Sequence, residues 1–104
     1  MSTELAMNAY VLLGNALHLF VNGMGMPPEA GVSPDAVRSL YTRIQPMIPA
    51  QIESGIAALA PDEKATLGAI CRYVILQTAP EEASATLGLP PEVIDQTLSQ
   101  LGLK

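Results

Sequence analysis

The stretch NAYVLLGNALHLFVN, residues 8–22, decides the fold, because it is the most apolar part of the chain and yet carries regularly spaced polar side chains. Asn8, Asn15 and Asn22 recur at every seventh position, and His18 lies between the last two. On a helix, these four side chains fall within about a quarter of the circumference, and the remainder is almost wholly apolar. A helix that is apolar on nearly all sides is normally central in its fold or shared between subunits.

The same segment raises the question of a membrane span, because residues 5–26 contain no charged side chain and about 20 apolar residues can cross a bilayer. Four strongly polar side chains inside this window oppose a lipid-facing span, and no basic or aromatic flanks anchor its ends. We therefore predict a long hydrophobic helix over residues 3–24 that forms the centre of the core and also a dimer seam. We expect no membrane binding.

Two interpretations of the asparagine spacing remain open. A polar residue at every seventh position can set the register of a helical interface between two chains. Alternatively, the asparagines form a thin hydrated stripe along a central helix. If the helix is an interface, the residues that we expect to contact a partner are Met7, Asn8, Asn15, Leu17, His18, Val21, Asn22 and Met24.

Proline followed by acidic residues recurs along the rest of the chain, in SPDAV, APDEK, APEEA and PPEVI, which begin at residues 33, 60, 79 and 90. Proline suits the first helical turn because its missing N–H has no partner there, and acids in that turn face the positive end of the helix dipole. We therefore assign most of the negative charge to helix starts. The further predicted helices span residues 34–45, 49–59, 61–78, 80–87 and 90–101, and Gly88 and Gly102 are predicted left-handed stops.

These segments predict an all-α protein with five to six helices in a single compact domain, residues 1–104, because no alternating strand pattern is present. Residues 61–102 resemble a tri-helical, helix-turn-helix-like unit, as in the helical part of winged-helix regulators. The last helix, however, carries no Lys or Arg before Lys104 and has acids near its start, so phosphate repulsion would oppose DNA. We expect this unit to serve packing or protein contact. A DNA-binding helix-turn-helix transcription regulator is the alternative.

The composition of the chain favours a protein partner. Its formal net charge is −5 with five basic residues, which disfavours nucleic acid because Lys and Arg must neutralise phosphates. Charged residues make up only 14% of the chain, against a usual share of about 25%. For so small a domain, this predicts an apolar surface that meets another molecule.

No catalytic, metal or cofactor pattern is present in the sequence. The single histidine and the single cysteine, His18 and Cys71, cannot supply three or four metal ligands. Cys71 lies on the predicted apolar face of its helix, where a buried structural thiol is far commoner than a nucleophile. One cysteine fits a reducing compartment, and the N-terminus MSTELAM lacks the basic segment of a secretory signal. We expect a cytoplasmic protein without enzymatic activity, metal or cofactor.

The function predicted from these features is that of a small non-enzymatic regulatory or adaptor protein. We expect a homodimer that acts by protein–protein binding, for example by sequestering a transcription regulator, and we do not expect nucleic acid as a partner. A second alternative is a small helical protein that binds an apolar ligand in a cavity lined by the first helix, with Met7 and Phe20 among its walls.

Overall fold

The computed structural model describes residues 3–103, apart from the side chains at positions 3, 80 and 83. Within this range the chain forms six α-helices, one π-helical turn and one 3-10 turn, and it contains no strand. These elements are α1 (Thr3–His18), η1 (Leu19–Gly23, the π-helical turn), η2 (Pro28–Ala30, the 3-10 turn), α2 (Pro34–Ile44), α3 (Pro49–Ala57), α4 (Pro61–Gln77), α5 (Pro80–Leu87) and α6 (Pro91–Gln100). The predicted all-α fold in one compact domain, with a long apolar first helix, is confirmed.

The helices α2 to α6 each begin at a proline. The residue before each proline is extended, because the proline ring disfavours the helical conformation at that position. Two of these starts also gain a cap from the third helical residue. Gln51 Oε1 accepts the N–H of Ile48 at 3.2 Å, and Glu63 Oε1 accepts the N–H of Ala60 at 2.9 Å. The predicted helix starts are therefore confirmed to within one residue.

Glycine follows α5 and α6 in the left-handed conformation, with φ of 79° at Gly88 and 73° at Gly102. After α6, the N–H of Gly102 donates to the carbonyl oxygen of Ser99 at 3.2 Å, and the N–H of Leu103 donates to that of Leu98 at 2.9 Å. This pair of bonds is a Schellman motif, which satisfies carbonyl groups at the end of a helix. Both predicted stops are confirmed, and the motif turns Leu103 back into the core.

The first helix continues beyond His18 as the wider turn η1. The N–H of Met24 donates to the carbonyl oxygen of Leu19 at 2.8 Å, a bond that spans five residues instead of four. Phe20 within this turn is fully buried and packs edge-on against Tyr73 of α4, with ring centroids 6.0 Å apart. The predicted extent of the first helix is right, but its last turn is π-helical and not α-helical.

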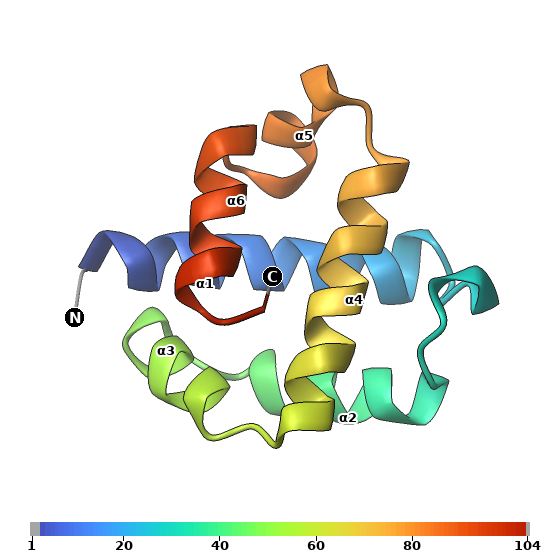
Figure 1. Cartoon of the computed structure of the whole chain (residues 1–104), viewed down its shortest axis with the longest axis horizontal. Coiled ribbons are helices and arrows are strands. Elements are labelled where there is room, and N and C mark those ends of the chain that lie inside the picture. The colour runs from blue at the N-terminus through green and yellow to red at the C-terminus, as the bar shows by residue number, and fades with distance from the viewer. Residues whose placement is uncertain (1–2, 104) are drawn as a thin grey trace.

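The central element of the fold is α1, which contacts each of the other five α-helices. In Figure 1 it runs horizontally through the middle, with α2 and α3 below it, α5 above it, and α4 and α6 crossing over it. All helices contribute to one hydrophobic core around α1. The largest fully buried side chains are Phe20, Leu12, Leu13, Leu17, Leu40, Ile52, Ile56, Leu67, Ile70, Leu87, Val37 and Val74.

By length and composition, the helical segment Glu4–Gly23 could cross a membrane, and it is the one such segment within the described residues. In this structure the segment lies at the centre of a globule, and other helices fully cover Ala9, Leu12 and Leu13. A core helix satisfies the same criteria of length and composition as a span.

The predicted tri-helical unit of residues 61–102 is not confirmed. The helices α5 and α6 pack on each other across the turn at Gly88, but α4, α5 and α6 each pack more on α1 than on one another. The physical reason is that α1 is apolar on several sides, so it offers each of these helices a larger apolar surface than they offer one another.

The C-terminal segment is attached to α4 at Gly68. The carbonyl oxygen of Leu103 lies so close to Gly68 that a β-carbon at this position would collide with it. Arg72 Nη1 donates to the same oxygen at 3.2 Å. The missing side chain of Gly68 therefore allows the chain end to pack directly on the α4 backbone.

We expect Gly68→Ala to lower the free energy of unfolding by about 1–3 kcal/mol, because the new methyl group meets backbone and cannot displace it cheaply. Gly55→Ala is the matched control: its β-carbon meets only the flexible end of Met47, and alanine favours a helix by about 1 kcal/mol. Urea denaturation of both variants checks this expectation. If Gly68→Ala were as stable as Gly55→Ala, the packing of the chain end on α4 would be wrong.

Candidate functional site

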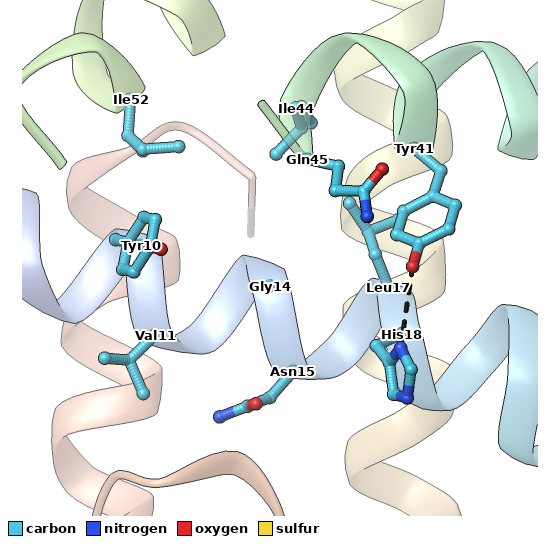
Figure 2. Close-up of a pocket in the computed structure, with 10 residues that line it drawn as sticks. All are labelled: Tyr10, Val11, Gly14, Asn15, Leu17, His18, Tyr41, Ile44, Gln45 and Ile52. Carbon is cyan, nitrogen blue, oxygen red and sulfur yellow. Dashed lines mark hydrogen bonds between the residues drawn. The ribbon is translucent and has the colours of Figure 1, made fainter. Parts of the chain in front are cut away.

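An open groove runs along α1, mainly between this helix and the pair formed by α2 and α3 (Figure 2). Its volume is about 470 Å³. The lining residues are Tyr10, Val11, Gly14, Asn15, Leu17 and His18 from α1, Tyr41 and Ile44 from α2, Gln45 directly after α2, and Ile52 from α3.

The groove has an apolar floor and an uncharged polar rim. Leu17, Ile44 and Ile52 are buried and form the floor, whereas Tyr10 and His18 are exposed at the edge. None of the ten lining residues is an acid, a lysine or an arginine. A buried charge without a partner costs free energy, because it loses its water. A binding surface for this groove is therefore expected to be uncharged as well.

Gly14 lies in the middle of the groove, between Tyr10 and His18 along α1 (Figure 2). A β-carbon at this position would have no atom within 4 Å, and the backbone of Gly14 is not left-handed. By contrast, β-carbons at Gly55 and Gly68 would meet neighbouring atoms of the fold. A glycine inside a helix costs about 1 kcal/mol relative to alanine. Nothing in the described part of the chain therefore requires glycine at position 14.

His18 is held by two neutral hydrogen-bonding groups at one end of the groove. Its Nδ1 lies 3.2 Å from Asn22 Nδ2 and 3.5 Å from the hydroxyl of Tyr41, and the second of these contacts is drawn in Figure 2. An amide nitrogen only donates, so the contact with Asn22 suits the tautomer in which Nδ1 accepts and Nε2 carries the proton, whereas the hydroxyl of Tyr41 can donate or accept. His18 thus links α1 to α2, and its exposed ring leaves Nε2 accessible to water or to another molecule.

The three regularly spaced asparagines have different surroundings. Asn15 Nδ2 donates to the carbonyl oxygen of Leu87 at 3.1 Å, which satisfies the C-terminal end of α5. Asn22 holds His18, and Asn8 lies half-buried beside Gln96 in a shallow pocket between α1 and α6. Each asparagine therefore has neighbours within the single chain, and both interpretations of the spacing stay open.

The residues predicted to contact a partner lie at different depths. Leu17 is only 1% exposed and belongs to the core, so a partner can reach it only as part of the groove floor. The exposed members of the set are Met7, Asn15, His18 and Asn22, and the half-buried members are Asn8, Val21 and Met24.

Two residues that the sequence analysis did not select, Tyr10 and Gly14, lie on the same exposed side of α1 as Met7 and His18. We call these four residues the open face of α1. Their helical spacing was visible in the sequence, since Tyr10 and His18 each lie four residues from Gly14. What the sequence did not contain was how far the uncovered side of this helix extends beyond the stripe of asparagines and His18.

Cys71 lies on the side of α4 that faces the hydrophobic core, and its side chain is fully buried. Burial raises the pKa of its thiol to about 12, although the neighbouring charge of Arg72 acts in the opposite direction. A thiol that keeps its proton is a poor nucleophile and a poor metal ligand. Cys71 therefore acts as a small apolar side chain, as the sequence analysis expects.

No group of three His, Cys, Asp or Glu side chains within residues 3–103 is placed to hold a metal ion. Comparisons of the chain with protein-family models, with curated proteins and with solved structures gave no match. The open face of α1 and the groove beside it are therefore the features that carry a functional proposal.

The buried thiol makes stability depend on alkaline pH. Above pH 9.0 the unfolded thiol loses its proton while the folded thiol keeps it, so stability falls as the pH rises toward 12. We expect the free energy of unfolding to fall more steeply in the wild type than in Cys71→Ala, by up to about 1.4 kcal/mol per pH unit. Urea denaturation at several pH values in this range compares the two slopes. Equal slopes would mean that Cys71 is not buried as described.

Proposed function

We propose that the protein is a small non-enzymatic regulatory or adaptor protein that binds another protein through the open face of α1 and the adjoining groove. One observation carries the proposal: Gly14, at the centre of this face, has open space where a side chain would lie. A glycine that weakens its own helix without a packing reason supports a close approach by another molecule.

The exposed side chains beside Gly14 support the same proposal. Met7 is 46% exposed and Tyr10 is 43% exposed, although both are large apolar residues on the central helix of the fold. Methionine and tyrosine are enriched in protein interfaces, because each offers a large contact area. Residues 5–26 carry no acid, lysine or arginine, so a partner can displace water here without burying an unpaired charge.

The groove complements this face with a place for an anchoring side chain. Its floor is apolar, and its rim carries the hydroxyl groups of Tyr10 and Tyr41. Residues that dominate binding energy usually fill such pockets near the centre of an interface, surrounded by groups that exclude water. The proposal makes no use of residues 61–102, because the tri-helical unit on which a helix-turn-helix role would depend is not confirmed.

A second candidate function, binding of a small uncharged ligand, is favoured by the size of the groove. Its 470 Å³ falls within the range of about 300–1,000 Å³ that is typical of ligand pockets. Its walls differ from those predicted, since Phe20 is fully buried and neither Phe20 nor Met7 lines it. Native mass spectrometry of the freshly purified protein distinguishes the two candidates. A stoichiometric small-molecule adduct that Gly14→Leu removes would favour the ligand.

Site-specific photocrosslinking in cells tests protein binding. With p-benzoylphenylalanine in place of Tyr10, we expect a crosslinked species above the mass of the single chain, because position 10 would lie within the interface. The same photoreactive residue in place of Glu92, which is exposed on α6, is the control and should give no such species. If position 10 crosslinks to no protein while the variant remains folded, the proposed function is wrong.

A further inference from the structure

We propose that the partner on the open face of α1 is a second copy of this chain, with the two α1 helices crossing in antiparallel directions at Gly14. This inference rests on the proposed function and names its partner. It also explains why Gly14 stands where alanine would fit the single chain equally well and would favour the helix. Helices in contact usually lie about 8–10 Å apart, and a glycine at the crossing point permits the closest approach.

The residues on either side of Gly14 make the open face complementary to itself. A two-fold axis at Gly14 places each residue opposite the one equally far on the other side of position 14. Tyr10 of one copy then faces His18 of the second, and this pair occurs twice. Met7 faces the turn η1 of the second copy, in which Val21 is half-buried.

The pair of Tyr10 and His18 also gives a protein partner to Nε2 of His18, which is exposed in the single chain. The contacts of His18 with Asn22 and Tyr41 are both made at Nδ1, and in the tautomer that accepts from Asn22 the Nε2–H is a donor. The hydroxyl oxygen of Tyr10 in the second copy can accept it, while the two aromatic rings contribute apolar contact. Two such hydrogen bonds, related by the axis, would fix the position of one helix on the other.

Charge favours the antiparallel direction. Each copy carries a formal net charge of −5, so two copies repel each other, and this repulsion is weakest when they meet through an uncharged surface. The open face is such a surface, and Glu4, the acid on α1, lies about 15 Å along the helix from Gly14. In the antiparallel arrangement the two Glu4 carboxylates lie roughly 30 Å apart along the crossing helices, whereas a parallel arrangement would bring them together.

The contact must extend beyond α1 to form a stable dimer. A typical stable interface covers about 800 Å² on each partner, which is about a seventh of the 5546 Å² that the single chain exposes. The groove rim at Tyr41 and Gln45 adjoins the open face. These side chains therefore belong to the proposed interface together with the open face.

Light scattering after gel filtration, over a wide range of concentrations, tests the second copy directly. The wild type should elute with twice the chain mass of 10.9 kDa. Gly14→Ala should raise the dissociation constant about tenfold or more, because two methyl groups enter the crossing. Gly14→Glu should be monomeric, because two carboxylates would face each other at the axis. Gln77→Glu adds the same charge on the exposed side of α4 and should remain dimeric.

Disulfide trapping tests the crossing point. In a Cys71→Ala background, Gly14→Cys should form a linked dimer under mild oxidation, because residues on a two-fold axis meet their own copies. Leu76→Cys, at a position 80% exposed on α4, is the matched control and should stay unlinked. Circular dichroism establishes that each variant is helical, and Gly14→Ala serves where a bulkier variant fails to fold.

Two results would overturn the second-copy proposal: a wild type that is monomeric at every concentration, or a Gly14→Glu variant that dimerises as tightly as the wild type. Photocrosslinking at position 10 separates this failure from that of the proposed function. If the crosslinked species does not have twice the mass of the chain, the proposed protein binding stands, but the partner is a different protein and not a second copy. The absence of any crosslinked protein overturns both proposals.

Discussion

The structure depends on covering one helix that is apolar on almost every side. The stretch of α1 and η1 supplies Leu12, Leu13, Leu17 and Phe20 to the centre of the core. At the spacing of an α-helix, these side chains spread over about 140° of the circumference. A single neighbouring helix could bury only part of that sector. The chain therefore surrounds α1 with five short helices, each of which packs on it. This requirement explains why α4, α5 and α6 each pack on α1 and not mainly on one another.

The five short helices cover α1 incompletely. The helices α4 and α6 cross over it, and α2, α3 and α5 lie along its sides, as Figure 1 shows. Met7, Tyr10, Gly14 and His18 remain exposed. A small domain has a large surface for its volume, and this chain has few charged side chains with which to cover that surface. Exposed apolar area on the central helix is a direct consequence of these two limits.

Helix boundaries were predictable from the sequence because proline and glycine fix local backbone conformation. The range predicted for α5 agrees at both ends, and that for α4 agrees to within one residue. The orientation of α1 was only partly predictable. The polar stripe of Asn8, Asn15, His18 and Asn22 indicated an outward side, and these residues are exposed or half-buried. The apolar remainder of the helix contains no signal that Met7 and Tyr10 are exposed while Leu17 is buried. Leu17 was therefore expected at an interface although it lies in the core, and Tyr10 and Gly14 were not selected. The groove is also a tertiary feature, because its floor brings together Ile44 and Ile52 from two further helices.

Gly14 connects the packing of α1 with the way the protein would associate. On a helix that every other α-helix contacts, a weak position in the middle reduces the stability of the whole fold by about the cost of one glycine. If a second copy covers this position, dimer formation stabilises the folded chain and offsets that cost. Because the dimer forms by mass action, this stabilisation is present only at concentrations at which the dimer exists. The last uncovered side of α1 would then be buried in the dimer and nowhere else. Completion of the core and recognition of the partner would become the same event, which ties the folded state of this small domain to its assembly.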